Sequence, residues 1–242
     1  MLELRSTILI PTANRNHLLE WSLKSIRGYY NGDIIVLNDY LPDASEQLAT
    51  KYGTRYIYTG SRNISGIKYR DQGFALNIGS KHTDADILVL TCAEMYHVND
   101  CMTHLLLPFE HDTKFITTAK IKYDLRGRIL KALDTNDILQ LDREQDMKRY
   151  LPFLVAVDHA TFNDINGYDE DMDGQAFTDN DIVDRLQGAG CYFVDTPALA
   201  IHLYHTRNMA GRDKQAWDKN KRLYDARKGM TIRNTDREWG QL

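Results

Sequence analysis

The chain has 242 residues, and its 43% hydrophobic and 26% charged residues are typical of an ordinary globular protein. Its 15 glycines and five prolines exclude a largely disordered chain, and no apolar run reaches the roughly 18 residues of a membrane span. The net charge of −4 combines an acidic body with a basic stretch from residue 206 onward, where ten Lys or Arg residues face five acids. We interpret that stretch either as a solvated terminal helix or as a flap near a phosphate-bearing ligand.

The first half of the chain alternates short apolar runs with helical patterns. Strands are predicted at residues 7–11, 33–37, 54–58 and 86–90, and helices at 16–30, 44–52 and 73–81. Continuous apolar strands separated by helices indicate a parallel sheet covered on both faces. Sheets of this class bind ligands at the carboxyl ends of their strands.

The second half is less regular. Strands are predicted at residues 114–121, 153–157, 191–194 and 199–203, and helices at 178–187 and 213–228. A single α/β domain with a mixed second half is the simplest fold class. Three scattered cysteines and the absence of a signal-peptide pattern favour a reducing, cytoplasmic location.

Polar loops follow three of the predicted parallel strands and should meet at one edge of the sheet. They are Pro-Thr-Ala-Asn-Arg at 11–15, Asn-Asp at 38–39 and Thr-Cys-Ala-Glu at 91–94. Each loop alone is typical of turns. No phosphate-binding glycine loop is present, which argues against a dinucleotide dehydrogenase and a P-loop NTPase. A bound nucleotide would then need a divalent cation with carboxylate and imidazole ligands.

Candidate side chains for such chemistry lie further along the chain. Glu94 follows a buried strand, and His202 and His205 are spaced H-x-x-H at the end of the last predicted strand. Residues three apart on a strand point to opposite faces, so one core and one surface histidine is the alternative. Asp179 begins a predicted helix, where it either stabilises the helix terminus or serves as an ionised general base.

Six motifs, taken in order, resemble those of GT-A fold glycosyltransferases. They read I-P-T-x-N-R, I-V-L-N-D, A-L-N-I-G with D-A-D-I-L-V-L, N-G-Y-D-E, T-D-N-D-I-V-D-R-L and H-L-Y-H, between about residues 8 and 208. The set is most similar to family 2, the inverting nucleotide-sugar transferases. The carboxy-terminal part is similar to galactosyltransferase and polypeptide N-acetylgalactosaminyltransferase catalytic domains. The resemblance implies a GT-A domain over residues 1–205, with a nucleotide-binding half at 1–97, a catalytic half at 98–205 and a basic flap and helix at 206–242.

The resemblance also implies roles for individual residues. The positions matching donor contacts in the family are Pro11, Thr12, Asn14, Asp39, Asn77 and Arg207, with Arg70 as a replacement for the family's Arg where this chain has Leu76. Thr-Cys-Ala-Glu aligns with the metal-binding D-x-D motif, so Cys92 stands in place of its first Asp. Glu94, His202 and His205 would hold Mn²⁺ or Mg²⁺, and Asp179 would be the catalytic base.

The expected function is an inverting, metal-assisted transfer of a sugar from a nucleoside diphosphate donor, most simply a UDP-sugar, to a hydroxyl acceptor. The sequence does not identify the acceptor, and the acidic body makes nucleic acid a minority choice. Two alternatives stay open. The degenerate metal motif is compatible with a non-catalytic nucleotide- or sugar-binding protein, and an α/β sheet with a metal also occurs in sugar nucleotidyltransferases.

Overall fold

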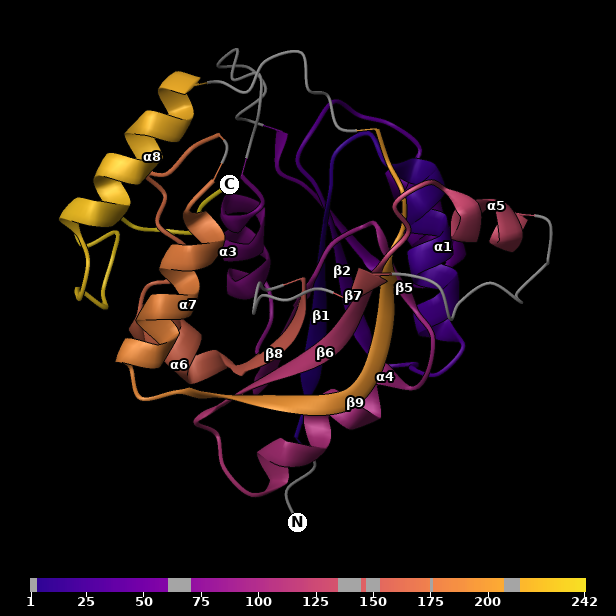
Figure 1. The fold of residues 1–242 in the computed structure, drawn as a ribbon, viewed down its shortest axis with the longest axis horizontal. Coiled ribbons are helices and arrows are strands. Elements are labelled where there is room, and N and C mark those ends of the chain that lie inside the picture. The colour runs from indigo at the N-terminus through magenta and orange to yellow at the C-terminus, as the bar shows by residue number, and fades with distance from the viewer. Residues whose placement is uncertain (1–3, 61–70, 135–144, 147–152, 175, 207–213) are drawn as a thin grey trace.

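The computed structural model describes residues 4–60, 71–134, 145–146, 153–174, 176–206 and 214–242 (Figure 1). Within these ranges nine strands form one sheet in the order β3-β2-β1-β4-β8-β6-β9-β5, with β7 paired to β6. The strands are β1 Ser6–Thr12, β2 Asp33–Asn38, β3 Arg55–Tyr58, β4 Ile87–Thr91, β5 Met95–His97, β6 Phe115–Tyr123, β7 Gln145–Asp146, β8 Leu154–Asp158 and β9 Tyr192–His202. The first four strands are parallel, as the sequence predicts.

Helices cover both faces of the sheet (Figure 1). They are α1 Asn16–Arg27, α2 Ser45–Lys51, α3 Gly73–Lys81, α4 Cys101–Leu106, α5 Arg128–Asp134, α6 His159–Asp164, α7 Thr178–Gly188 and α8 Lys214–Ala226, with a short 3₁₀ turn at Leu107–Glu110. No helix in the described ranges is both long and apolar enough to cross a membrane.

Alternation along β1 shows how the two faces become separate cores. Ile8 and Ile10 pack with α1, α2 and α4, whereas Leu9 packs with α3, α6 and α7. Side chains of successive strand residues point to opposite faces, so a fully apolar strand must be covered twice. Because helices cover both faces of the sheet, ligands bind at the ends of the strands.

The second half of the sheet is mixed, as expected, but one strand is longer than predicted. β8 runs antiparallel to both β4 and β6, while β9 pairs parallel with β6 and antiparallel with β5. The prediction of two strands at 191–194 and 199–203 is wrong because β9 continues through Pro197. A register shift between Thr118 and Lys120 of β6 lies opposite this interruption, and such irregularities accommodate a residue that lacks an N–H.

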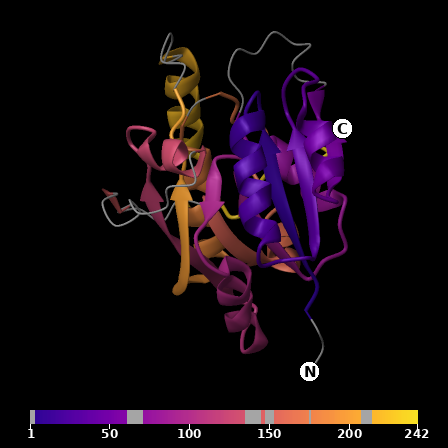
Figure 2. The ribbon, with the colours of Figure 1, turned by 90° about the vertical axis from the view of Figure 1, so that its right-hand side faces the viewer.

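Several short elements have no clear periodic signal in the sequence. α4 and α6 have six residues each, and each begins after an aspartate whose carboxylate accepts the N–H three residues on: Asp100 from Thr103 and Asp158 from Thr161. Figure 2 shows the molecule from the side, with the carboxy-terminal end of the chain beside the parallel half of the sheet. The last residues of the chain therefore belong to the same body as the first strands.

Candidate active site

The ends of β1 and β2 form the floor of a polar site. The Asp39 N–H donates to the Thr12 carbonyl at 2.9 Å, and the Thr59 hydroxyl donates to Asp39 Oδ1 at 2.7 Å. The buried Thr12 hydroxyl has no hydrogen-bond partner among the described residues. Pro11, Thr12 and Asp39 therefore lie together at the predicted edge. Asn14 is exposed on the loop beyond, with a left-handed φ of 54°.

Two carboxyl groups meet where α3 and α7 begin. The Thr178 hydroxyl donates to Asp71 Oδ2 at 2.5 Å, and the Gly73 N–H donates to Asp71 Oδ1 at 2.7 Å. Asp179 is the next residue of α7, near enough for its charge to act on Asp71. Asp179 Oδ1 is buried without a hydrogen-bond partner in the described part of the chain. A carboxylate oxygen in that condition is available to accept a proton from a substrate.

The backbone just before α7 is strained. Ala176 and Phe177 have φ angles of 79° and 70°, in the left-handed region that side chains other than glycine adopt at a cost of about 1–3 kcal/mol each. The Asn220 amide of α8 donates to the Ala176 carbonyl at 3.0 Å. The Phe177 ring packs edge-on against Trp217 of the same helix, with 5.1 Å between centroids. Contacts with α8 thus hold the turn that presents Asp179.

Burial shifts the titration of this region toward neutral pH. It raises the pKa of Asp71 to about 7, with the charge of Asp179 as the second cause. It also raises the pKa of Asp179 to about 6, against a hydrogen bond from Gln72 that lowers it. Burial raises the pKa of the Cys92 thiol well above its usual range, and the charge of Glu94 adds to this effect. Cys92 is therefore a neutral thiol near pH 7.

The raised pKa values predict how stability depends on pH. An unfolded Asp ionises near about pH 4, whereas the folded pair keeps its protons up to about pH 6–7, so this pair's contribution to stability falls across that interval. Asp71→Asn removes one of the two titrations. Urea unfolding gives the free energy of unfolding of the variant and of the wild type at each pH. We expect the difference, variant minus wild type, to be about 2 kcal/mol larger at about pH 8 than at about pH 5. An equal stability difference at both pH values would contradict the prediction.

Glu94 and His205 meet across the guanidinium of Arg15. Arg15 Nε lies 3.2 Å from Glu94 Oε1, and Arg15 Nη2 lies 3.4 Å from His205 Nδ1. The Leu203 N–H donates to the Glu94 carbonyl at 2.8 Å, which fixes the end of β9 beside the loop after β4. A positive charge therefore stands between two of the three predicted metal ligands.

His202 is adjacent to this cluster. Its ring centroid lies 5.3 Å from that of His205, and it packs against the rings of Tyr123 and Phe153 at 5.1 and 5.7 Å. Both histidines thus lie at one end of β9, as the chemistry of the predicted site needs. The described residues nevertheless contain no preformed group of three His, Cys, Asp or Glu side chains arranged to hold a metal.

Asn77, expected as a donor contact, makes hydrogen bonds within the fold. This residue is completely buried, and its amide nitrogen donates to the Tyr168 carbonyl and to Glu170 Oε1, both at 3.0 Å. Its oxygen accepts the Tyr168 N–H at 2.7 Å. These bonds fix the loop after α6, and the role of Asn77 as a donor contact stays a prediction. The predicted donor contacts Arg70 and Arg207 lie outside the described residues.

The described part of the basic carboxy-terminal stretch pairs with acidic side chains of the fold. Four of its basic side chains pair with acids of the 169–181 segment: Lys219 with Asp173, Arg227 with Asp169 and Asp171, Arg233 with Asp169 and Asp181, and Arg237 with Asp171. The opposite charges of the body and the tail therefore neutralise each other within the fold. This pairing fastens the tail to the helix that carries Asp179.

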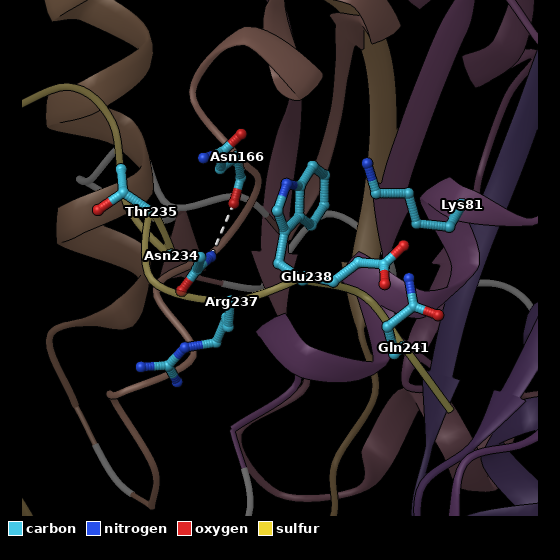
Figure 3. Close-up of a pocket in the computed structure, with 8 residues that line it drawn as sticks. Lys81, Asn166, Asn234, Thr235, Arg237, Glu238 and Gln241 are labelled. Atoms are coloured by element: carbon cyan, nitrogen blue, oxygen red, sulfur yellow. Dashed lines mark hydrogen bonds between the residues drawn. The ribbon is translucent and has the colours of Figure 1, made fainter.

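A pocket of about 430 Å³ lies at the far end of α3, between that helix and the carboxy-terminal segment (Figure 3). Lys81 Nζ stands 3.4 Å from the centre of the Trp239 ring, and the Asn234 amide donates to the Asn166 carbonyl at 2.8 Å. Asp71 and Thr178 lie at the opposite, amino-terminal end of α3. The pocket is thus separate from the strand-end site.

Two functional candidates are absent from the sequence-based set. Arg15 is the last residue of the I-P-T-x-N-R motif. Its position directly after the first strand is the feature of the sequence that indicates a place at the ligand-binding edge. Asp71 precedes α3 by two residues, the spacing at which an aspartate caps a helix, and that spacing alone indicates only a structural role. Its neighbourhood with Asp179 depends on a tertiary contact spanning more than a hundred residues.

Comparison with solved structures supports the GT-A architecture. GalNAc-T7 with UDP, GalNAc and Mn²⁺ matches with a TM-score of 0.61 and 13% identity over 84% of this chain and 44% of that one. The mannosyltransferase PcManGT of Pyrobaculum calidifontis, with GDP-Man and Mn²⁺, matches with a TM-score of 0.60 and 15% identity over 91% of this chain and 61% of that one. Glucosyl-3-phosphoglycerate synthase of Mycobacterium tuberculosis, with Mn²⁺, UDP and glucosyl-3-phosphoglycerate, matches with a TM-score of 0.56 and 17% identity over 96% of this chain and 82% of that one.

The chain spans less than two thirds of GalNAc-T7 and of the mannosyltransferase, so these likenesses concern the shared fold. No curated protein sequence matches the chain. The sequence profile of glycosyl transferase family 2 matches residues 7–163, which contain the parallel strands, Asp39, Asp71 and Glu94. Because this match covers most of its length, the chain belongs to glycosyl transferase family 2.

Proposed function

We propose that the protein transfers a sugar from a nucleoside diphosphate donor, most simply a UDP-sugar, to a hydroxyl acceptor with inversion at the anomeric carbon. The observation that carries this proposal is the buried, unpartnered Oδ1 of Asp179 at the start of α7. This carboxylate stands near Cys92 and the Glu94 loop, at the strand-end edge where α/β sheets bind nucleotides.

In the proposed reaction Asp179 accepts the proton of the acceptor hydroxyl as its oxygen bonds to the anomeric carbon. The bond from that carbon to the diphosphate oxygen breaks, and its electron pair leaves with the nucleoside diphosphate. A single base without a protein nucleophile gives one displacement, hence inversion, by the reasoning that applies to glycosidases. The raised pKa of Asp179 suits a general base working near neutral pH.

For the donor we assign the nucleoside to Pro11, Thr12, Asn14 and Asp39. The unpartnered Thr12 hydroxyl and the Asp39 carboxylate, which is only 5% exposed, supply hydrogen-bonding groups for it. On the basis of the family resemblance, we also propose that Arg70 and Arg207 contact the diphosphate. Arg15 joins them, because its guanidinium already stands at the strand-end edge.

The three proposed ligands have the donor chemistry of a divalent cation site, although the described residues do not bring them together as a preformed site. Glu94, His202 and His205 offer a carboxylate and two imidazoles, ligands that suit Mn²⁺, and the position between Glu94 and His205 already favours a positive charge. We assign Mn²⁺ or Mg²⁺ to these three residues. When bound, such a cation would polarise the diphosphate oxygens and stabilise their negative charge.

Calorimetry with UDP tests the metal assignment. We expect Mn²⁺ to tighten UDP binding at least about tenfold, because a cation held by Glu94, His202 and His205 would offset the negative charge of the diphosphate. Glu94→Gln should remove this gain. A UDP affinity that is indifferent to Mn²⁺ in the wild type would contradict the assignment.

A second candidate is a non-catalytic nucleotide- or sugar-binding protein. The contact between Arg15 and Glu94 favours it, because a guanidinium can neutralise a diphosphate without any metal. Nucleotide binding that persists without turnover would favour this candidate. Release of nucleoside diphosphate from a sugar nucleotide would favour the transferase. The three buried free cysteines suit a reducing compartment in either case.

A further inference from the structure

Asp71 is a buried carboxyl group that the proposed mechanism does not yet use. It accepts the Gly73 N–H at the start of α3 and the Thr178 hydroxyl at the start of α7. Its two oxygens thus join two helices that are distant in the sequence. The joint lies one residue from Asp179, the proposed base.

Among the described residues, the charges that act on this carboxyl are negative. Asp179 on α7 and Asp39 at the end of β2 both oppose its ionisation. Tyr168, from the loop after α6, also faces the pair, and its buried phenol has a pKa well above its usual range. The neutral phenol supplies no compensating charge. Gln72 contributes a neutral hydrogen bond to Asp179, and Cys92 stays a neutral thiol.

Two carboxyl groups in one poorly solvated place cannot both ionise easily. We propose that Asp71 is the positioning partner of Asp179, tying α7 to α3 through Thr178 and sharing a single proton with the base. This inference rests on the proposed function, since it gives Asp179 its role. In the working state Asp71 carries the proton and Asp179 carries the charge.

The proton on Asp71 also limits the negative charge that a donor diphosphate meets. When Asp71 ionises as well, the site gains a second charge near the phosphates and donor affinity falls. Asp71→Asn is a neutral mimic of the protonated side chain and keeps an oxygen for the Gly73 N–H. Its donor affinity should therefore lose the dependence on pH that Asp71 imposes.

The test is calorimetric binding of UDP-glucose and GDP-mannose from about pH 5.5 to about pH 8, chosen to span the raised titration. For the better probe, the wild-type dissociation constant should rise at least about threefold across this range, and that of Asp71→Asn should rise clearly less, because only Asp179 still titrates in the variant. Asp43→Asn is the matched control, because Asp43 likewise accepts the N–H two residues on, that of Ser45. The control should follow the wild type. Parallel curves for the wild type and Asp71→Asn would overturn the proposal.

Turnover separates the inference from the function on which it rests. Thr178→Val removes the hydroxyl and leaves Asp71, so it should lower kcat at least about fivefold with little change in donor KM. Wild-type turnover that needs Asp179, together with an unchanged kcat in Thr178→Val, would overturn the positioning role and leave the function standing. Absence of wild-type turnover with every donor would overturn the proposed function itself.

Discussion

Asp179→Asn is expected to lower sugar transfer at least about a hundredfold while donor affinity stays within about twofold, since general bases contribute roughly 10²–10⁴-fold. The amide has nearly the shape of the carboxylate but cannot accept the acceptor's proton. Asp179 Oδ1 makes no hydrogen bond to the described residues, and the amide oxygen of the variant can still accept the hydrogen bond from Gln72, so we expect the fold to be retained. Initial rates of nucleoside diphosphate release and calorimetric donor binding check the two halves of this prediction.

Asp184→Asn is the control for that experiment. Asp184 lies on the same helix and accepts the Tyr224 hydroxyl on the protein surface, away from Asp71 and Thr178. It should retain wild-type rates. Transfer by Asp179→Asn at the wild-type rate would remove the residue from its role as the base.

The second large effect concerns stability. Arg233→Met should destabilise the protein by about 3 kcal/mol, because two buried carboxylates that each contact two cations would each lose one of them. Arg233 is 5% exposed and lies 2.8 Å from Asp181 and 3.1 Å from Asp169. Asp181 also bonds Arg185 at 2.6 Å, in the core of α7. Urea unfolding with far-UV circular dichroism measures the loss.

Lys221→Met provides the comparison. Lys221 pairs with Asp225 one turn along α8, and about half of each side chain is exposed. Exposed pairs of this kind contribute less than about 1 kcal/mol. A loss for Arg233→Met no greater than that for Lys221→Met would show that the buried network does not hold the tail to α7.

The parallel half of the fold follows directly from local patterns. Uninterrupted apolar runs such as that of β2 are buried on both faces, and helical spacing identifies α1 and α3. The sequence predicts two strands where β9 is continuous through Pro197, a residue usually confined to strand edges and bulges. The continuity of β9 depends on pairing with β6 on one side and β5 on the other, which no local pattern encodes.

Individual site residues were harder to predict than the edge on which they lie. Strand order alone brings Thr12 beside Asp39, so their proximity could be predicted. Asn77 illustrates the opposite case, because the same amide suits a ligand or a loop and only the fold shows that it binds the Tyr168 backbone. The basic tail likewise could not be interpreted from its charge, since its partners lie far away in the sequence on the 169–181 segment.

The most direct test of the central claim is a screen of sugar nucleotides for release of nucleoside diphosphate. UDP-glucose, UDP-GalNAc and GDP-mannose would be incubated with the wild type, Mn²⁺ and a set of hydroxyl acceptors, with Asp179→Asn in parallel. We predict release from at least one donor by the wild type and none above background by the variant. Release from no donor, or equal release by both proteins, would contradict the account.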